Sequence, residues 1–204
     1  MFMKLLYSPA SPFARKVRVL AAEAGLADRI EVVTVTAVPS APPPDFARDN
    51  PLAKIPTLII GAGDVLYDSR VIAEFLDTLH TGTPLFPVPG PARWTALRRQ
   101  ALADGAMDAA ILARYEAILR PAELNWPDWV AGQKGKITRA LDALEAEADH
   151  LSQQVTIGEI SIACLLEYLD FRFADDAWRK DRPKLAAFAA SFGARPSMIS
   201  TRPA

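Results

Sequence analysis

The sequence predicts an α/β domain followed by an all-helical domain. In residues 1–80, short apolar runs alternate with helical segments in the order β-α-β and then β-β-α. After residue 91, apolar residues recur at helical spacing to near the end of the chain. Residues 81–91 contain four prolines and two glycines, a composition that is typical of a linker. We therefore expect domains at 1–80 and 92–204, joined by 81–91.

Short apolar and β-branched runs predict the four strands of the first domain. These runs cover residues 2–7, 30–35, 57–60 and 65–67. A helix over 12–24 begins after Ser11, which is a favourable N-cap, with Pro12 at the first helical position. Asp68 or Ser69 caps the helix that ends this domain.

The second domain predicts four helices. Apolar residues at helical spacing place two of them within 94–119 and 126–151. The third begins after Thr156, which forms a capping box with Glu159, and the last follows Pro183. We therefore assign Glu159 a structural role.

The composition is that of an ordinary globular protein. The 204 residues carry a net charge of -1, so neither nucleic acid nor a membrane surface is expected as a partner. One cysteine, Cys164, and two histidines are a poor metal-ligand set, so no metal is expected. A single cysteine cannot form an internal disulfide, which fits a reducing compartment. The chain shows neither a signal-peptide core nor the roughly 18 apolar residues of a membrane span, so we expect a cytoplasmic location.

Four short motifs follow one another along the chain. They are SPASPFARKVR at 8–18, NPLAKIPTL at 50–58, YDSRVI at 67–72 and TIGEISIA at 156–163. With the domain order, they resemble the cytosolic glutathione transferase superfamily, in particular its serine-type members. Residues 101–105 and 168–172 are similar to a bacterial YibF-like group within it. The resemblance implies a thioredoxin-like N-terminal domain that holds glutathione and a C-terminal helical-bundle domain.

The resemblance assigns Ser11 the role of stabilising the thiolate of glutathione. The thiolate is the nucleophile, and a free thiol with a pKa of about 8.5 is only slightly ionised at neutral pH. A hydroxyl donor and the amides of a helix N-terminus lower that pKa. Ser8, in the same turn, is the second candidate, and Tyr7, at the end of the first strand, is the third. From the residues alone, a plain N-cap is the commoner role for a serine at position 11.

Two further motifs imply contacts with the rest of glutathione. Pro56 would be a cis-proline that presents the backbone of Ile55 to the cysteinyl part, and Lys54 would neutralise a carboxylate. The alternatives are a trans proline that starts an edge strand and a solvated lysine. Asp68 and Ser69 match the pair that binds the γ-glutamyl group, Ser69 its carboxylate and Asp68 its ammonium. N-capping is the alternative role of this pair, and both roles are compatible.

In the family, the acceptor substrate binds between the first helix and the start of the helical domain. We take Phe13, Met107, Asp108 and Ile111 as candidates for its lining. Asp104 and Asp108 share a helix face at i and i+4, which we interpret as an exposed, solvated face.

The resemblance implies a homodimeric glutathione transferase that uses glutathione as co-substrate and detoxifies a small electrophile. One alternative is a glutathione-dependent thiol-disulfide oxidoreductase, and another is a non-catalytic regulatory or binding protein on the same fold. The first-helix motif has no cysteine, which speaks against a mixed disulfide on the protein. Cys164 lies in an apolar helix and is expected to be an inert core thiol.

Overall fold

The computed structural model describes residues 2–36, 38–151 and 154–203. The chain divides into two compact units, one of Met1–Gly90 with Arg195–Ala204 and the other of Pro91–Ala194. The boundary after Gly90 falls within the proline-rich segment that we expected to be the linker. The C-terminal segment differs from the expected 92–204 domain, because Arg195–Ala204 packs with the N-terminal unit.

The N-terminal unit contains a mixed four-stranded sheet. Its strands are β1 (Met3–Tyr7), β2 (Ile30–Thr34), β3 (Thr57–Ile60) and β4 (Asp64–Leu66). Their order is β2-β1-β3-β4, with β1 parallel to β2, antiparallel to β3, and β3 antiparallel to β4. This is the β-α-β and β-β-α order that the sequence predicts, and the α/β prediction for this part is confirmed.

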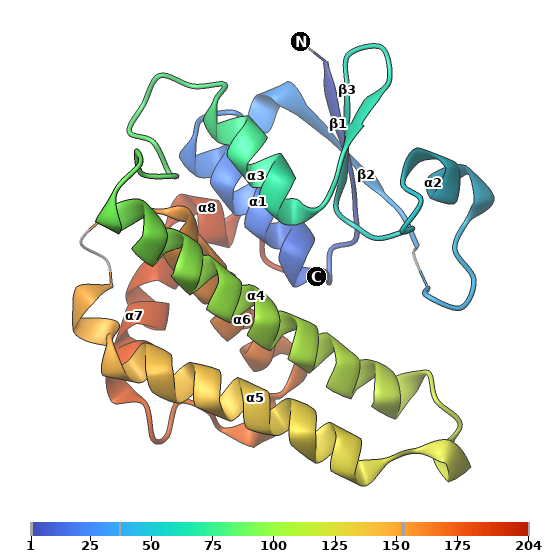
Figure 1. Cartoon of the computed structure of the whole chain (residues 1–204), viewed down its shortest axis with the longest axis vertical. Coiled ribbons are helices and arrows are strands. Elements are labelled where there is room, and N and C mark those ends of the chain that lie inside the picture. Colours follow the sequence, from blue (N-terminus) through green and yellow to red (C-terminus); the bar gives the residue numbers. More distant parts are fainter. Residues whose placement is uncertain (1, 37, 152–153, 204) are drawn as a thin grey trace. The chain divides into compact units, whose positions relative to one another are not determined.

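The N-terminal unit also contains helices. They are α1 (Pro12–Glu23), η1 (Ala27–Arg29), α2 (Pro44–Asp49), α3 (Ser69–Asp77) and α8 (Pro196–Ile199). Helices α1 and α3 pack against each other on one face, and α2 lies on the other (Figure 1). Large apolar side chains of β1, α1 and α3 are completely buried there, including Leu5, Leu20 and Ile72. The amphipathic pattern of the two long helices therefore builds the core of this unit.

The C-terminal segment is held on α1 by charged hydrogen bonds. Arg195 donates to both carboxylate oxygens of Glu23, at 2.8 and 2.7 Å, and the Ser197 hydroxyl donates to Glu23 at 2.5 Å. The buried Arg15 donates to the carbonyl oxygen of Met198 at 3.0 Å. The Arg195 guanidinium holds the pKa of Glu23 below its ordinary value, and the Ser197 hydrogen bond adds to this against the opposing effect of burial.

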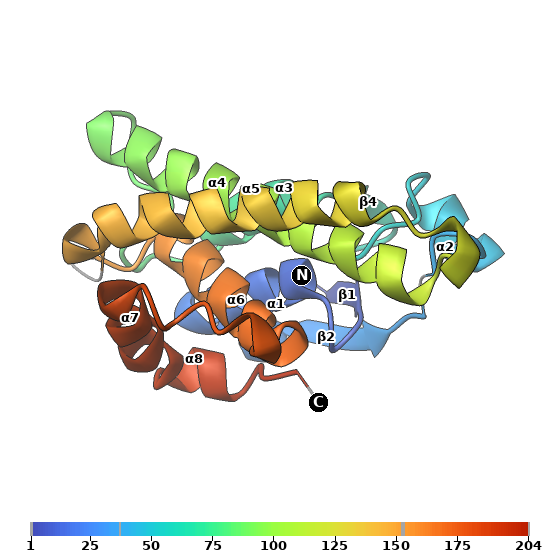
Figure 2. The ribbon, with the colours of Figure 1, turned by 90° about the horizontal axis from the view of Figure 1, so that it is seen from below.

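The second unit is entirely helical. Its elements are α4 (Pro91–Ile118), η2 (Ala122–Leu124), α5 (Pro127–Ala146), η3 (Ala148–His150), α6 (Ile157–Arg172), η4 (Ala174–Asp176) and α7 (Pro183–Gly193). Helix α4 packs against both α5 and α6, and α7 packs against α5 and α6 (Figures 1 and 2). The four long helices agree with the sequence prediction, and the helical-bundle prediction is confirmed.

The start of α6 is tied to α4 by a buried charge network. Thr156 caps α6, and Glu159 accepts hydrogen bonds from the Thr156 amide and hydroxyl, so the predicted capping box is present. Glu159 also accepts from Arg99 of α4 at 2.7 Å. A Cβ at Gly158 would lie 3.0 Å from the carbonyl oxygen of Ala96, so a glycine is needed for this close approach. Glu159 is thus structural, as predicted, and it additionally joins two helices.

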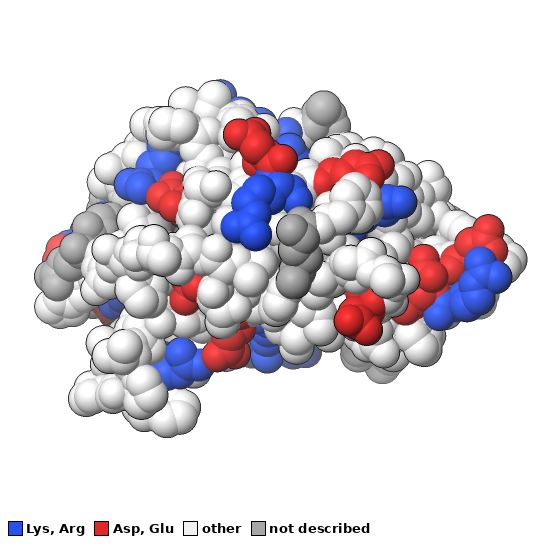
Figure 3. Space-filling view, turned by 90° about the horizontal axis from the view of Figure 1, so that it is seen from above, with Lys and Arg blue, Asp and Glu red and all other residues white. Residues whose placement is uncertain are grey.

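Charged side chains of both signs are interspersed on the face that Figure 3 shows. In the described part of the chain, no helix is both long and apolar enough to cross a membrane. The same described residues contain no group of three or more His, Cys, Asp or Glu side chains placed to hold a metal ion.

Candidate functional site

Three loops that carry predicted site residues meet at one edge of the sheet. Leu6, near the end of β1, pairs with Thr57 at the start of β3. Leu58 of β3 pairs with Leu66 at the end of β4. The turn after β1, the loop before β3 and the turn after β4 therefore lie at the same edge.

Ser11 stands in the first of these loops, at the N-terminus of α1. Its Oγ accepts a hydrogen bond from the Ala14 amide at 3.2 Å, so Ser11 is the N-cap that the sequence predicts. A hydroxyl that accepts through a lone pair keeps its proton for a second partner. Because the side chain is half-buried, it remains accessible. The cap and a donor role toward a bound anion are therefore geometrically compatible.

The two other candidates in this loop have different surroundings. The Ser8 carbonyl oxygen accepts from the Ser11 amide at 3.0 Å, which closes the turn before α1. Tyr7 is the last residue of β1, and its ring lies 5.1 Å from the guanidinium of Arg18. Ser8 thus shapes the turn, and Tyr7 packs as an aromatic residue at a strand end.

The second loop contains the predicted cis-proline. The Ile55–Pro56 peptide bond is cis. The ladder between β1 and β3 ends at Thr57, so the backbone of Ile55 lies just outside the sheet pairing. Strand β3 is an interior strand, so the alternative of a trans proline at the start of an edge strand is wrong. Lys54 is exposed to solvent beside this bond.

Asn50 organises the second loop, a role that we did not assign from the sequence. Its side-chain amide donates to the Lys54 carbonyl oxygen and to the Thr57 hydroxyl, both at 2.9 Å, and its oxygen accepts from the Leu52 amide at 3.0 Å. Ala53 has a φ of 48°, which this turn imposes on a residue other than glycine. Asn50 is 1% exposed, so its three hydrogen bonds are made inside the protein. The motif at 50–58 contained the signal for this role, which is the asparagine itself. An asparagine that holds a turn must pair both the donors and the acceptor of its side-chain amide.

The third loop leads into the N-terminus of α3 (Ser69–Asp77). Asp68 is the N-cap of α3, and its carboxylate accepts from the Arg70 amide at 2.9 Å. Ser69 follows as the first helical residue and is 3% exposed. The Tyr67–Asp68 peptide bond is cis. The amides at such a helix start carry a partial positive charge that favours a carboxylate.

Comparison with known proteins decides the family. Residues 10–79 match the glutathione S-transferase N-terminal domain, and residues 127–191 match the glutathione S-transferase C-terminal domain. The chain is 32% identical to the uncharacterized GST-like protein YibF of Escherichia coli over 204 residues, which cover 98% of each chain. This chain belongs to the glutathione S-transferase family.

Two solved structures of a glutathione transferase family member from Pseudomonas fluorescens are similar to this chain throughout. One, with bound glutathione, is 49% identical, covers 99% of each chain and has a TM-score of 0.97. The other, with bound S-(propanoic acid)-glutathione, is 48% identical over 99% of this chain and 100% of that one, with a TM-score of 0.93. The resemblance and the fold class that the sequence predicts are thereby confirmed.

The residues predicted to line the acceptor site of the transferase belong to different units. Phe13 lies in α1 and is half-buried. Of the three in α4, Met107 is completely buried, Ile111 is half-buried and Asp108 is exposed. Asp104 is only 1% exposed, so our interpretation of Asp104 and Asp108 as one solvated face is wrong for Asp104.

Proposed function

We propose that this member of the glutathione S-transferase family binds glutathione at the sheet edge, stabilises its thiolate and transfers it to a small electrophile. The observation that carries the proposal is the convergence of three loops at one edge. Two of them contribute helix N-termini, at Ser11 and Ser69, and the third contributes the backbone before the cis bond at Pro56. Each offers donors to a different part of an anionic tripeptide.

Each part of glutathione is assigned by chemistry. The γ-glutamyl carboxylate takes the amide and hydroxyl of Ser69, and its ammonium takes the carboxylate oxygen that Asp68 does not use for capping. The cysteinyl backbone pairs with Ile55 as an added strand would. Lys54, exposed beside it, neutralises the other carboxylate. The sulfur then lies toward Ser11, with Ser8 as the second donor of that turn.

The energy required for thiolate formation is within reach of one hydroxyl and one helix. Lowering a thiol pKa from about 8.5 to about 6.5 needs about 2.7 kcal/mol of differential stabilisation. A hydrogen bond to a charged group contributes about 1.5–3 kcal/mol. A helix N-terminus adds about 0.3–1 kcal/mol. Together these ranges span the required free energy, so the Ser11 hydroxyl with the start of α1 can supply it without a cationic side chain.

The similar structures support the binding of glutathione. The Pseudomonas fluorescens protein, about half identical to this chain, holds glutathione in one structure and a glutathione substituted at sulfur in the other. The proposal extends this binding to the present chain and adds transfer to an electrophile. It includes the homodimer that the family resemblance implies, which sedimentation of the purified protein tests.

Exchange of a disulfide through a cysteine of this protein has no support in the structure. The sequence contains one cysteine, Cys164, and it is completely buried in α6. A regulatory role without catalysis requires no thiolate, whereas the donors at the sheet edge are those that a thiolate needs.

The deciding experiment is calorimetric titration with glutathione, followed by ultraviolet detection of bound thiolate. We expect the wild type to bind glutathione as thiolate, and Ser69→Ala to bind more weakly. Ser11→Ala should still bind but lose the thiolate signal. A folded wild-type protein that binds no glutathione at millimolar concentration would contradict the proposal and favour a regulatory protein on the same fold.

A further inference from the structure

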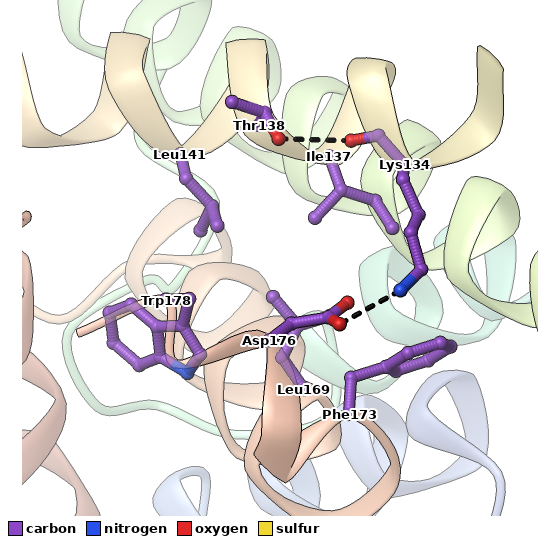
Figure 4. Close-up of a pocket in the computed structure, with 8 residues that line it drawn as sticks. All are labelled: Lys134, Ile137, Thr138, Leu141, Leu169, Phe173, Asp176 and Trp178. Atoms are coloured by element: carbon purple, nitrogen blue, oxygen red, sulfur yellow. Dashed lines mark hydrogen bonds and ion pairs between the residues drawn. The ribbon is translucent and has the colours of Figure 1, made fainter. Parts of the chain in front are cut away.

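A cavity of about 230 Å³ opens within the helical unit, where α5 faces the end of α6 (Figure 4). One wall comes from α5, and the other comes from the end of α6, from η4 and from the turn after η4. Five of the lining side chains have apolar or aromatic bodies: Ile137, Leu141, Leu169, Phe173 and Trp178. A cavity of about 150 Å³ with such a lining holds benzene, so this one has room for an aromatic ring with a substituent.

Charged hydrogen bonds join the two walls on either side of the cavity. Toward the start of α5, Lys134 donates to Asp176 of η4 at 2.8 Å. About two turns further along α5, Arg182 donates to Asp142 at 3.0 Å and to the carbonyl oxygen of Trp178 at 3.1 Å. The two bridges are about 12 Å apart along the helix. They hold the walls in place, so a ligand need not reorganise them, which lowers the cost of binding.

Trp178 supplies an aromatic wall whose orientation is fixed. It is 6% exposed, and its Nε1–H donates to Asp170 at 2.9 Å. The guanidinium of Arg179 lies 4.5 Å from the centroid of the Trp178 ring. Ala177 has a φ of 44°, a conformation that is uncommon for residues other than glycine, and its turn places Asp176 and Trp178 on the same cavity. Because the indole N–H is already occupied, Trp178 offers a ligand apolar ring surface.

The polar side chains of the cavity mark its opening to solvent. The side chains of Lys134 and Asp176 are 44% and 42% exposed, whereas Leu141 and Leu169 are buried. Lys134 donates to Oδ1 of Asp176, and Oδ2 of Asp176 has no partner within the described part of the chain. The Thr138 hydroxyl donates to the carbonyl oxygen of Lys134 at 3.1 Å, which leaves it a lone pair that can accept from a ligand. The opening therefore offers both donors and acceptors, while its ion pair has no net charge.

This arrangement selects among the polar groups that a ligand could carry. A hydroxyl group can accept from the Lys134 ammonium group and donate to Asp176, so it leaves the ion pair intact. A carboxylate would be repelled by Asp176, and an ammonium group would be repelled by Lys134. The cavity is thus complementary to an aromatic ring that carries a hydroxyl group.

We propose that this cavity binds a small uncharged aromatic alcohol, such as a phenol. The ring of the ligand lies among the apolar side chains of the two walls, and its hydroxyl group lies at the pair of Lys134 and Asp176. All residues of this site belong to the helical unit, and none of them is a candidate for the acceptor site of the transferase. The site is therefore independent of the proposed function.

The test is calorimetric titration of the full chain with p-cresol, p-toluate and p-xylene, probes of similar shape that differ in one substituent. At neutral pH p-cresol is uncharged, since a phenol has a pKa of about 10, whereas p-toluate is an anion. We expect p-cresol to bind, and p-toluate to bind at least about tenfold more weakly because of its charge.

Ile137→Phe fills the cavity from the α5 wall. We expect it to weaken p-cresol binding at least about tenfold, because the larger side chain occupies the space of the ligand ring. Ile118→Phe, the same exchange at a 54% exposed position of α4, is the matched control and should bind p-cresol as the wild type does. Far-ultraviolet circular dichroism checks that both variants are folded.

Lys134→Met tests the polar end of the cavity and leaves its apolar lining unchanged. Methionine keeps an unbranched stem but lacks the ammonium group that would donate to the hydroxyl of p-cresol. We expect the ratio of the affinities for p-cresol and p-xylene to fall by about tenfold. Because the side chain at position 134 is 44% exposed, this variant should fold even if Ile137→Phe does not.

Four results would each overturn the proposal. They are no binding of p-cresol by the wild type at millimolar concentration, binding of p-toluate as tight as that of p-cresol, an unchanged affinity ratio in Lys134→Met, and an equal p-cresol affinity in folded Ile137→Phe and Ile118→Phe. The last result would mean that p-cresol binds elsewhere on the protein.

Discussion

The Ser11 hydroxyl oxygen accepts a hydrogen bond from the Ala14 amide at 3.2 Å, which caps α1 and leaves the hydroxyl proton unused. Ser11 can therefore be both the N-cap of α1 and a hydrogen-bond donor, two roles that were alternatives from the sequence. The cap fixes the oxygen at the helix start, and the hydroxyl proton stays available for a second partner. Capping therefore positions the donor that we assign to the thiolate.

The two roles of Ser11 can be separated by substitution. Ser11→Asp keeps a capping oxygen, so we expect unfolding stability near that of the wild type. It places a negative charge near the sulfur, however, and should raise the pKa of bound glutathione instead of lowering it. Ser11→Ala should lose about 1 kcal/mol of stability and also the thiolate. Ultraviolet titration of the bound thiol and urea unfolding measure the two effects.

Ser8→Ala is the control for these variants, because it removes the other hydroxyl of the same turn. We expect its thiolate signal to remain, since the Ser8 backbone carbonyl, not its side chain, closes the turn. Loss of thiolate in Ser8→Ala with retention in Ser11→Ala would reassign the donor to Ser8.

A second prediction concerns Asn50, which holds the loop before the cis bond. Asn50→Asp keeps the oxygen that accepts from Leu52 but loses the donors to Lys54 and Thr57. Because Asn50 and Thr57 are buried, we expect a loss of about 1–3 kcal/mol in the free energy of unfolding. Glutathione affinity should fall as well, since the backbone of Ile55 is no longer fixed. Asp45→Asn, at an exposed position of α2, is a matched exchange of the same two side chains that should leave both quantities unchanged.

Local patterns were enough to predict most of the fold. Ser11 with Pro12 marked the start of α1, and Thr156 with Glu159 marked the start of α6. Both were predictable because the residues that form a helix cap are close together in the sequence. The docking of α8 on α1 was not predictable, since Glu23 and Arg195 are far apart in sequence. Its four residues also carry too short a pattern to show a helix.

The sequence motifs predicted the residues of the candidate site, whereas their arrangement in space depends on tertiary contacts. Ser11, Pro56 and Ser69 each lie in a recognisable motif, but only the strand register places their loops at one edge. Our interpretation of Asp104 and Asp108 as a solvated helix face was wrong for Asp104, which is buried. Spacing identifies residues that share a helix face, but it does not show whether that face is buried.

A third prediction tests the buried network between α4 and α6. Glu159→Asp keeps a carboxylate for the Thr156 cap. The shorter side chain reaches less far toward Arg99, which donates a hydrogen bond of 2.7 Å to Glu159 in the wild type. Arg99 retains Glu147 at 3.2 Å, so its charge is not left alone. We expect a loss of about 1–3 kcal/mol in unfolding stability, less than for complete removal of a buried partner. Glu159→Ala should cost more, about 3–5 kcal/mol, and equal losses in the two variants would contradict the bridging role.

The last prediction is a pH dependence of the docking of the C-terminal segment. Arg195 holds the pKa of Glu23 below its ordinary value of 4.5. A carboxyl group whose pKa is lower in the folded state stabilises that state above its unfolded pKa. The contribution is therefore complete near neutral pH and is lost as the pH falls below about 4.5 through the folded pKa. Hydrogen exchange of the C-terminal segment should accelerate over that range.

Glu23→Gln provides the control for this pH effect. It removes the titrating charge but keeps an oxygen that can accept from Ser197. We expect exchange of the C-terminal segment to be faster than in the wild type at neutral pH and to change little on acidification below about pH 4.5, apart from the intrinsic pH dependence of exchange. Exchange in β1, measured in the same experiment, reports global unfolding and should be less affected. If the segment in Glu23→Gln still loosened in acid as strongly as in the wild type, other carboxylates would have to control its docking.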